Sequence, residues 1–385
     1  MVRRMFANPL VLRTMHQYSG AAKDPAPLAN GTPLFAAGHC LRLVALALLA
    51  CSVSCGRVQG DGAALPARQE LIHFSSDGFT LAGTVYLPAG VGPHPAVVLF
   101  HGSGPQERYE FEGQWFAEHG VAALTYDKRG VGESTGDFRS VPFMTLCDDG
   151  LAAIQLLKAR RDIDQHRIGV WGLSQGGWLG PLAASRSSDV AFVIAVSGPG
   201  VSPGEQMLYF WASDLRDQGV PDRQVEEATT LRREVWNYME TGNGYEGAKA
   251  DLERARTAPW YRQVKQQRDD LFSTLETPEQ LRRSTHRWFQ QEAVYDPTVA
   301  LRKLRVPSLF LFGEDDHTIP VPDSVRIIRE MLTQSGTRDF TIREFPKTDH
   351  GMFVLDANGG RVRSDDYLKR MSDWLAAHHF SSAGR

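Results

Sequence analysis

Short apolar runs of strand length alternate with longer stretches of helical periodicity through most of this chain. The strand-like runs cover residues 71–74, 80–86, 96–100, 121–126, 167–171, 191–196, 308–312 and 340–345. The helical stretches cover residues 110–119, 142–160, 175–186, 322–333 and 364–379. Such alternation is typical of an α/β fold, in which helices cover both faces of a mostly parallel sheet. We therefore expect about eight strands, with the first two forming an antiparallel pair around the turn at Asp77-Gly78.

One interval, residues 201–305, breaks this alternation because it contains no clear buried strand. Within it, residues 225–239 and 277–291 carry apolar side chains at the three-to-four spacing of amphipathic helices. The interval is therefore predicted to be a helical insertion between the sixth and seventh strand-like runs. The expected organisation is a leader and tether over residues 1–65, a core over 66–200 and 306–385, and the insertion over 201–305.

The N-terminal region has the features of an export signal. An apolar run from Leu43 to Val53 follows Arg42 and is too short for the roughly 20 residues of a membrane-spanning helix. It is typical of a signal peptide, and residues 48–51 resemble a bacterial lipobox, in which Cys51 would carry a lipid. A buried core segment or a plain cleaved signal are the alternatives. We expect an exported protein, either periplasmic or anchored to the membrane as a lipoprotein through Cys51; without export it would be cytoplasmic.

Composition narrows the possible partners. Lysine and arginine total 42 against 45 acidic residues, so the formal net charge is −3, and no basic stripe points to nucleic acid. Cys147 is the single cysteine outside the N-terminal region, and the cysteine spacing fits neither a disulfide framework nor a zinc site. No metal and no organic cofactor are expected, and the sequence leaves the oligomeric state open.

Chemistry is first indicated by the pattern Gly172-x-Ser174-x-Gly176, which lies between a predicted strand and a predicted helix. A sharp turn in that setting exposes the serine hydroxyl, and the free N–H groups at the start of the helix favour a developing anion. The alternative is a tight turn in which the glycines have only a structural role. We expect Ser174 to be a nucleophile.

A serine nucleophile needs a base, and the base needs a carboxylate to orient it. The loop after the strand at 308–312 offers three acids, Glu314, Asp315 and Asp316. The loop after the last strand offers His350, followed by Gly351. Other late histidines fit plainer roles: a solvent-facing loop position for His317 and the end of the last helix for residues 378–379. His350 is therefore the expected base.

Residues 70–380 resemble the α/β-hydrolase superfamily, and within it bacterial carboxylesterases that carry a helical cap between strands six and seven, which are related to serine aminopeptidase-like hydrolases. The resemblance implies that residues 201–305 form this cap. The resemblance rests on the loop H-G-S-G-P at residues 101–105, the turn D-x-R-G-x-G-x-S at 127–134, the serine pattern and the two late loops. The family pattern G-x-x-D-x-x-(V/I)-P falls on residues 313–320 and favours Asp316 as the acid.

This resemblance implies a serine hydrolase that cleaves carboxylic esters through an acyl-enzyme intermediate. Ser174 would attack the carbonyl, His350 would take its proton and Asp316 would stabilise the imidazolium. The backbone N–H groups of Gln175 and Ser103 would bind the oxyanion. A small ester of short to medium acyl chain is the expected substrate. His101, Asp127 and Arg129 are expected to be structural.

Two alternatives remain open. A serine aminopeptidase or amidase would share this fold and would need cap carboxylates that grip an ammonium group, with Glu205, Glu226, Glu227 and Glu234 as candidates. A non-catalytic, envelope-anchored binding protein is the other, since fold alone does not define function. The aromatic residues of the cap are expected mainly to hold its helices together, with some lining an apolar cleft.

Overall fold

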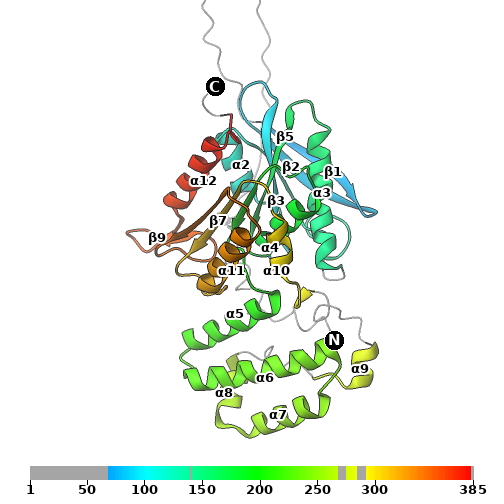
Figure 1. Ribbon diagram of the computed structural model, residues 1–385, viewed down its shortest axis with the longest axis vertical. Coiled ribbons are helices and arrows are strands. Elements are labelled where there is room, and N and C mark those ends of the chain that lie inside the picture. The colour runs from blue at the N-terminus through cyan, green and yellow to red at the C-terminus, as the bar shows by residue number, and fades with distance from the viewer. Residues whose placement is uncertain (1–67, 139–140, 268–274, 284–291, 383–385) are drawn as a thin grey trace, which may run out of the picture.

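The core of the protein is an eight-stranded sheet with the order β1-β2-β4-β3-β5-β6-β7-β8 (Figure 1). The computed structural model describes residues 68–138, 141–267, 275–283 and 292–382. The strands are β1 (Arg68–Ser76), β2 (Phe79–Leu87), β3 (His94–Phe100), β4 (Ala122–Tyr126), β5 (Ile163–Leu173), β6 (Val193–Val196), β7 (Ser308–Gly313) and β8 (Phe340–Phe345). β1 and β2 form an antiparallel hairpin, β2 is antiparallel to β4, and the remaining neighbours are parallel. The predicted mostly parallel sheet is confirmed.

Apolar side chains on both faces explain why the central strands form. Every residue of β3, β4, β6 and β7 is buried, as expected where helices cover both faces of a parallel sheet. Helices α2 (Glu110–Glu118) and α12 (Asp365–Ala377) pack on one face. Helices α3 (Phe143–Lys158), α4 (Gln175–Arg186) and α11 (Val321–Gln334) pack on the other (Figure 1).

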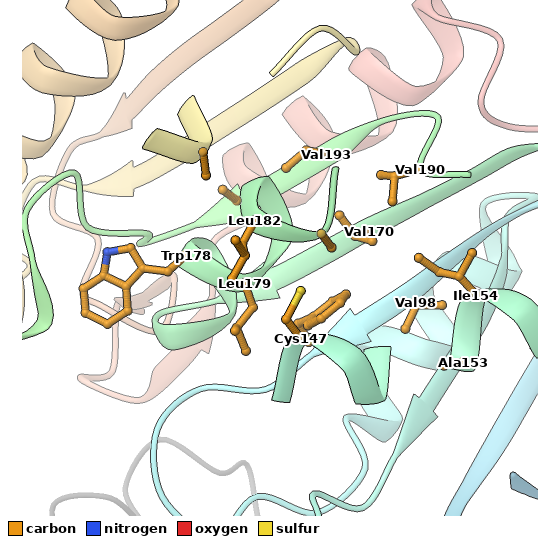
Figure 2. Packing of buried hydrophobic residues seen from close by; sticks show 14 of the residues in the cluster. Val98, Cys147, Ala153, Ile154, Val170, Trp178, Leu179, Leu182, Val190 and Val193 are labelled. Carbon is orange, nitrogen blue, oxygen red and sulfur yellow. The ribbon is translucent and has the colours of Figure 1, made fainter. Parts of the chain in front are cut away.

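The face under α3 and α4 forms the larger apolar cluster of the core. Figure 2 shows Val98 of β3 and Val170 of β5 facing Leu179 of α4 and Ile154 of α3. Cys147 lies in the same cluster and is fully buried, and burial raises the pKa of its thiol to about 11. Cys147 is thus a small buried side chain of the core.

Helices separate β6 from β7, as the sequence predicted for this interval. They are α5 (Pro203–Asp217), α6 (Asp222–Thr241), α7 (Tyr245–Thr257), α8 (Pro259–Gln267) and α9 (Pro278–Arg283). The predicted helix at 225–239 lies within α6, whereas the predicted helix at 277–291 is observed only as α9, and residues 284–291 lie outside the described residues. In Figure 1 this helical insertion extends from one end of the sheet. Its helices share an apolar core of their own around Trp211, Trp236 and Trp260.

Two features were absent from the sequence-based prediction. The short helix α10 (Pro297–Lys303) returns the chain from the insertion to β7. A small hairpin of β9 (Phe353–Leu355) and β10 (Arg361–Arg363) lies between β8 and α12. Among the described helices, none is long and apolar enough to cross a membrane. The predicted leader and Cys51 lie outside the described residues.

Candidate active site

Ser174 occupies a sharp turn between β5 and α4. Its backbone is in the left-handed region, with φ 56° and ψ −113°, a strain that costs about 1–3 kcal/mol for a residue with a side chain. The turn closes because its neighbours are glycines. A Cβ added at Gly172 would lie 2.2 Å from the carbonyl oxygen of Gly176, and one added at Gly176 would lie 2.5 Å from that of Phe100. The sequence pattern thus forms the predicted strand-turn-helix elbow, with Ser174 half-buried at the end of the sheet.

Asp316 and His350 form a buried pair. Asp316 Oδ2 lies 2.7 Å from His350 Nδ1, and Asp316 Oδ1 accepts hydrogen bonds from the backbone N–H groups of Thr318 and Ile319 at 2.8 and 3.1 Å. The two backbone hydrogen bonds to Oδ1 hold the carboxylate in place while Oδ2 contacts the imidazole. The neighbouring acids Glu314 and Asp315 are exposed. Of the three acidic residues in this loop, Asp316 is therefore the one that contacts the histidine.

The end of β6 connects this pair with the serine turn. Ser174 N donates to the carbonyl oxygen of Val196 at 2.9 Å. The next residue, Ser197, donates from its hydroxyl to the carbonyl oxygen of His350 at 2.8 Å. Because β5, β6, β7 and β8 are adjacent parallel strands, their carboxyl ends bring Ser174, Asp316 and His350 to the same edge of the sheet.

The loop at residues 101–105 lies against the serine turn. A Cβ added at Gly102 would lie 3.8 Å from Ser174 Cβ. The Gly102 N–H donates to the Tyr109 hydroxyl at 2.9 Å, and His101 Nε2 lies 2.5 Å from the carbonyl oxygen of Tyr126. Burial lowers the pKa of His101 to about 3, so its ring is neutral at physiological pH and holds the loop in place. Ser103 is exposed on this loop.

Gln175 is the first residue of α4, so its N–H has no acceptor within the helix. The side chain of Gln175 contacts Lys128, a residue for which the sequence indicated no role. Lys128 Nζ donates to Gln175 Oε1 at 2.7 Å, to Gly102 O at 2.8 Å and to Gly104 O at 3.2 Å. Burial lowers the pKa of Lys128 to about 7, while the carboxylates of Glu292 and Asp149 act in the opposite direction.

The neighbours of Lys128 hold the surrounding turns. Asp127 accepts from Arg108 at 2.9 Å and from the backbone N–H of Glu133 at 3.0 Å. Arg129 is fully buried and forms two hydrogen bonds to Asp149, at 3.1 and 2.5 Å. These contacts agree with the structural roles expected for Asp127 and Arg129. Lys128 occupies the unspecified position between them in the family pattern, which is why the pattern did not single it out.

The hairpin that the sequence analysis missed supports the His350 loop. Arg361 lies 2.8 Å from Asp349 in an ion pair, and Arg363 donates to the carbonyl oxygen of Gly351 at 2.5 Å. Arg361 and Arg363 belong to β10, so this strand contacts the residues on either side of His350. Each hairpin strand has three residues, which is too short for alternation to predict.

The insertion contacts the Asp316 loop through α5. Gln206 Nε2 donates to the carbonyl oxygen of Thr318 at 2.7 Å, and Asp217 Oδ2 lies 2.8 Å from Nδ1 of the exposed His317. The four glutamates considered for binding an ammonium group are all exposed: Glu205, Glu226, Glu227 and Glu234. Glu205 is engaged by Arg233 at 2.6 Å. Within the described part of the chain, no group of three His, Cys, Asp or Glu side chains is arranged to hold a metal ion.

The strand order and the loops at its carboxyl edge define an α/β-hydrolase. The chain belongs to the family described as serine aminopeptidase, S33, whose model matches residues 92–357. Esterase EstD of Thermotoga maritima is 25% identical over 299 residues, which cover 75% of this chain and 61% of the esterase. A polyketide transferase from a Penicillium species is 30% identical over 133 residues, covering 34% of this chain and 45% of the transferase. The matched region therefore spans less than two thirds of either relative.

Solved structures share the fold at low sequence identity. The Pyrococcus furiosus esterase PF2001 has a TM-score of 0.50 and 14% identity, covering 81% of this chain and 91% of the esterase. The α/β hydrolase GrgF from Penicillium sp. sh18 has a TM-score of 0.50 and 19% identity, covering 81% and 99%. At these identities the likeness concerns the fold alone.

Proposed function

We propose that this protein is a serine hydrolase that cleaves carboxylic esters, with Ser174, His350 and Asp316 as its catalytic triad. The observation that carries the proposal is the buried Asp316–His350 pair at the same edge of the sheet as the strained Ser174 turn. A carboxylate on Nδ1 leaves Nε2 of the imidazole to accept a proton, as a serine nucleophile requires.

The reaction follows from these roles. Ser174 Oγ attacks the ester carbonyl carbon while His350 accepts the hydroxyl proton, giving a tetrahedral oxyanion. The C–O bond to the alcohol then breaks, and His350 returns the proton to the leaving alkoxide. Water, deprotonated by His350, attacks the acyl-enzyme. The bond between the acyl carbon and Ser174 Oγ then breaks, the acid leaves, and His350 returns the proton to Ser174 Oγ. Asp316 stays ionised throughout and stabilises the imidazolium.

The backbone N–H groups of Gln175 and Ser103 are the proposed oxyanion donors. Support comes from the start of α4 at Gln175 and from the contact of the 101–105 loop with the serine turn. Such donors act strongly because they are fixed before charge develops, and removal of one typically lowers the rate about 10²- to 10³-fold.

An ester of short to medium acyl chain is the proposed substrate, bound beneath the helical insertion acting as a cap. An uncharged acyl group needs only an apolar pocket, and one relative of this chain is named as an esterase. The exposed positions of Glu205, Glu226, Glu227 and Glu234 give no support for ammonium binding by an aminopeptidase.

Active-site labelling tests the proposal directly. A fluorophosphonate should react with Ser174 Oγ, the P–F bond breaking as fluoride leaves, and peptide mapping should locate the adduct on Ser174. Ser174→Ala should lose labelling and reduce ester hydrolysis about 10⁴-fold or more. Equal background rates for the two proteins would support the binding-protein alternative. Faster cleavage of aminoacyl p-nitroanilides than of p-nitrophenyl esters would support the peptidase alternative.

We further propose that the protein is exported and anchored through a lipid on Cys51. Support comes from the apolar run before it and the lipobox-like residues 48–51. In bacteria fed labelled palmitate, the full chain should incorporate label and fractionate with membranes, and Cys51→Ser should abolish both. Cys55→Ser is the matched control and should retain both. Label retained by Cys51→Ser would contradict the proposal.

A further inference from the structure

Lys128 is an ammonium group buried at the point where two loops of the candidate site meet. It lies two residues after the end of β4 and is only 2% exposed, and its ammonium lies 5.4 Å from the Phe138 ring centroid. The reaction outlined above assigns this residue no step. Burial of a lysine is unfavourable unless its ammonium is fully hydrogen-bonded, so its contacts need an explanation.

The three acceptors of Lys128 belong to the two segments that carry the proposed oxyanion donors. The carbonyl oxygens of Gly102 and Gly104 flank Ser103, and the Oε1 atom belongs to Gln175. An ammonium group has three N–H donors, which matches three acceptors. One side chain therefore fixes the Gly102–Ser103 peptide unit, which carries the Ser103 N–H, and the Gly104–Pro105 peptide unit, and ties both to the side chain of Gln175.

We propose that Lys128 is a positioning residue that sets the separation of the Ser103 and Gln175 N–H groups and so preorganises the oxyanion site. This inference rests on the proposed function. Oxyanion donors are effective only when they are held at hydrogen-bond distance from where the charge develops, and a displacement of about 1 Å lowers the rate about 10²-fold. Lys128 Nζ also lies 2.8 Å from Gly102 O, in the peptide unit that carries the Ser103 N–H, so its positive charge is close to the proposed oxyanion site.

If Lys128 is a positioning residue, its replacement should weaken stabilisation of the transition state and leave binding of the ground-state substrate nearly unchanged. Lys128→Met keeps most of the unbranched side chain but removes all three donors. We expect kcat for a p-nitrophenyl ester to fall about 10²- to 10³-fold, the loss measured when one oxyanion donor is removed, while KM changes less than threefold. The inhibition constant of an aryl trifluoromethyl ketone should rise by a similar factor, because Ser174 adds to its carbonyl and gives an oxyanion held in the same site.

The matched control is Lys158→Met. The Lys158 ammonium also makes a short contact, 2.6 Å from Asp189. Lys158 is the last residue of α3 and precedes the start of β5, so it lies at the edge of the sheet opposite the candidate site. This variant should keep kcat and the inhibition constant. A second variant, Lys128→Arg, retains a charged donor group and should recover part of kcat and of the inhibitor affinity. Thermal unfolding of each variant shows whether the fold is intact.

The possible outcomes distinguish a failure of the positioning role from a failure of the proposed function. If wild-type protein is labelled at Ser174 and Lys128→Met keeps its kcat and inhibitor affinity, the positioning role is wrong and the hydrolase proposal stands. A folded Lys128→Met with raised KM and unchanged kcat would also overturn it, because that pattern indicates lost substrate binding. If wild-type protein is neither labelled nor active, the proposed function itself fails.

Discussion

Asp316 contacts His350 with one carboxylate oxygen while its other oxygen accepts two backbone N–H groups of its own loop. The carboxylate can therefore orient the imidazole without rotating. Asp316→Asn should keep the backbone contacts but present an amide that no longer selects the required imidazole tautomer. We expect kcat for ester hydrolysis to fall about 10⁴-fold, measured in steady state at neutral pH.

Asp315→Asn is the control for that variant. Asp315 is exposed, adjoins Asp316 and differs from it in making no contact with the imidazole in the described structure. Its replacement should leave kcat within about twofold. Equal activities of the two variants would exclude Asp316 as the acid of the triad.

Close packing at the start of α4 should make Gly176 far less tolerant than Gly180 in the same helix. A Cβ at Gly176 would meet the Phe100 carbonyl oxygen at 2.5 Å, whereas one at Gly180 would meet only valine methyl groups at 3.4 and 3.5 Å. Gly176→Ala should lower the free energy of unfolding by about 1–3 kcal/mol or more. Gly180→Ala should be within about 1 kcal/mol of wild type. Chemical denaturation compares them, and equal midpoints would contradict the packing described.

The Arg129–Asp149 pair should be a strong structural requirement with no direct role in the reaction. Both side chains are buried, so Arg129→Met leaves an uncompensated carboxylate and should destabilise the protein by about 3–5 kcal/mol. The double variant Arg129→Met with Asp149→Leu removes both charges and should regain most of that loss. Denaturation of the two proteins tests this, and an equally unstable double variant would show that the ion pair is not the cause.

Deprotonation of Lys128 should make kcat decrease at alkaline pH. Burial lowers the pKa of this lysine to about 7, and a neutral amine has two donors for three acceptors. The charged or titratable groups facing it are Glu292, Asp149 and His101, and the low pKa of His101, about 3, keeps that ring neutral throughout this range. We expect kcat to decrease as the pH rises above about 7. Lys128→Arg should remove the decline, and a decline that persists would assign it to another group.

The same lowered pKa has a consequence for stability. An unfolded lysine titrates near 10.4, so between pH 7 and about 10 the unfolded chain binds more protons at this position than the folded one. The contribution of Lys128 to the free energy of unfolding therefore rises with pH across this window. Denaturation at several pH values should show wild type gaining stability relative to Lys128→Met, and a difference independent of pH would contradict the lowered pKa.

The strands of the sheet could be predicted from the sequence because β3, β4, β6 and β7 are buried along their whole length. Its limits appear where local pattern is weak. The β9–β10 hairpin has strands of three residues, and α10 is a single short helix after a long insertion. Neither has enough periodicity to be predicted, and both are positioned by tertiary contacts such as those of Arg361 and Arg363.

The candidate site was predictable to a similar degree. Ser174 follows from its turn pattern and His350 from its place after the last strand, but residue chemistry alone left three acids open. Family resemblance selected Asp316, and the contact with His350 agrees with that choice. Lys128 could not be predicted because its function depends on acceptors that come from two distant loops, and nothing local to residue 128 indicates them.

Two consecutive residues at the end of β6 hold the serine turn through Val196 and the histidine loop through Ser197. Any displacement of this strand therefore carries both partners in the same direction, and the gap between them changes less than the position of either. The relative position of the serine turn and the histidine loop therefore depends on this strand rather than on the helices outside the sheet. The end of this four-residue strand thus links two segments that lie 176 positions apart in the sequence, the serine turn at Ser174 and the loop at His350.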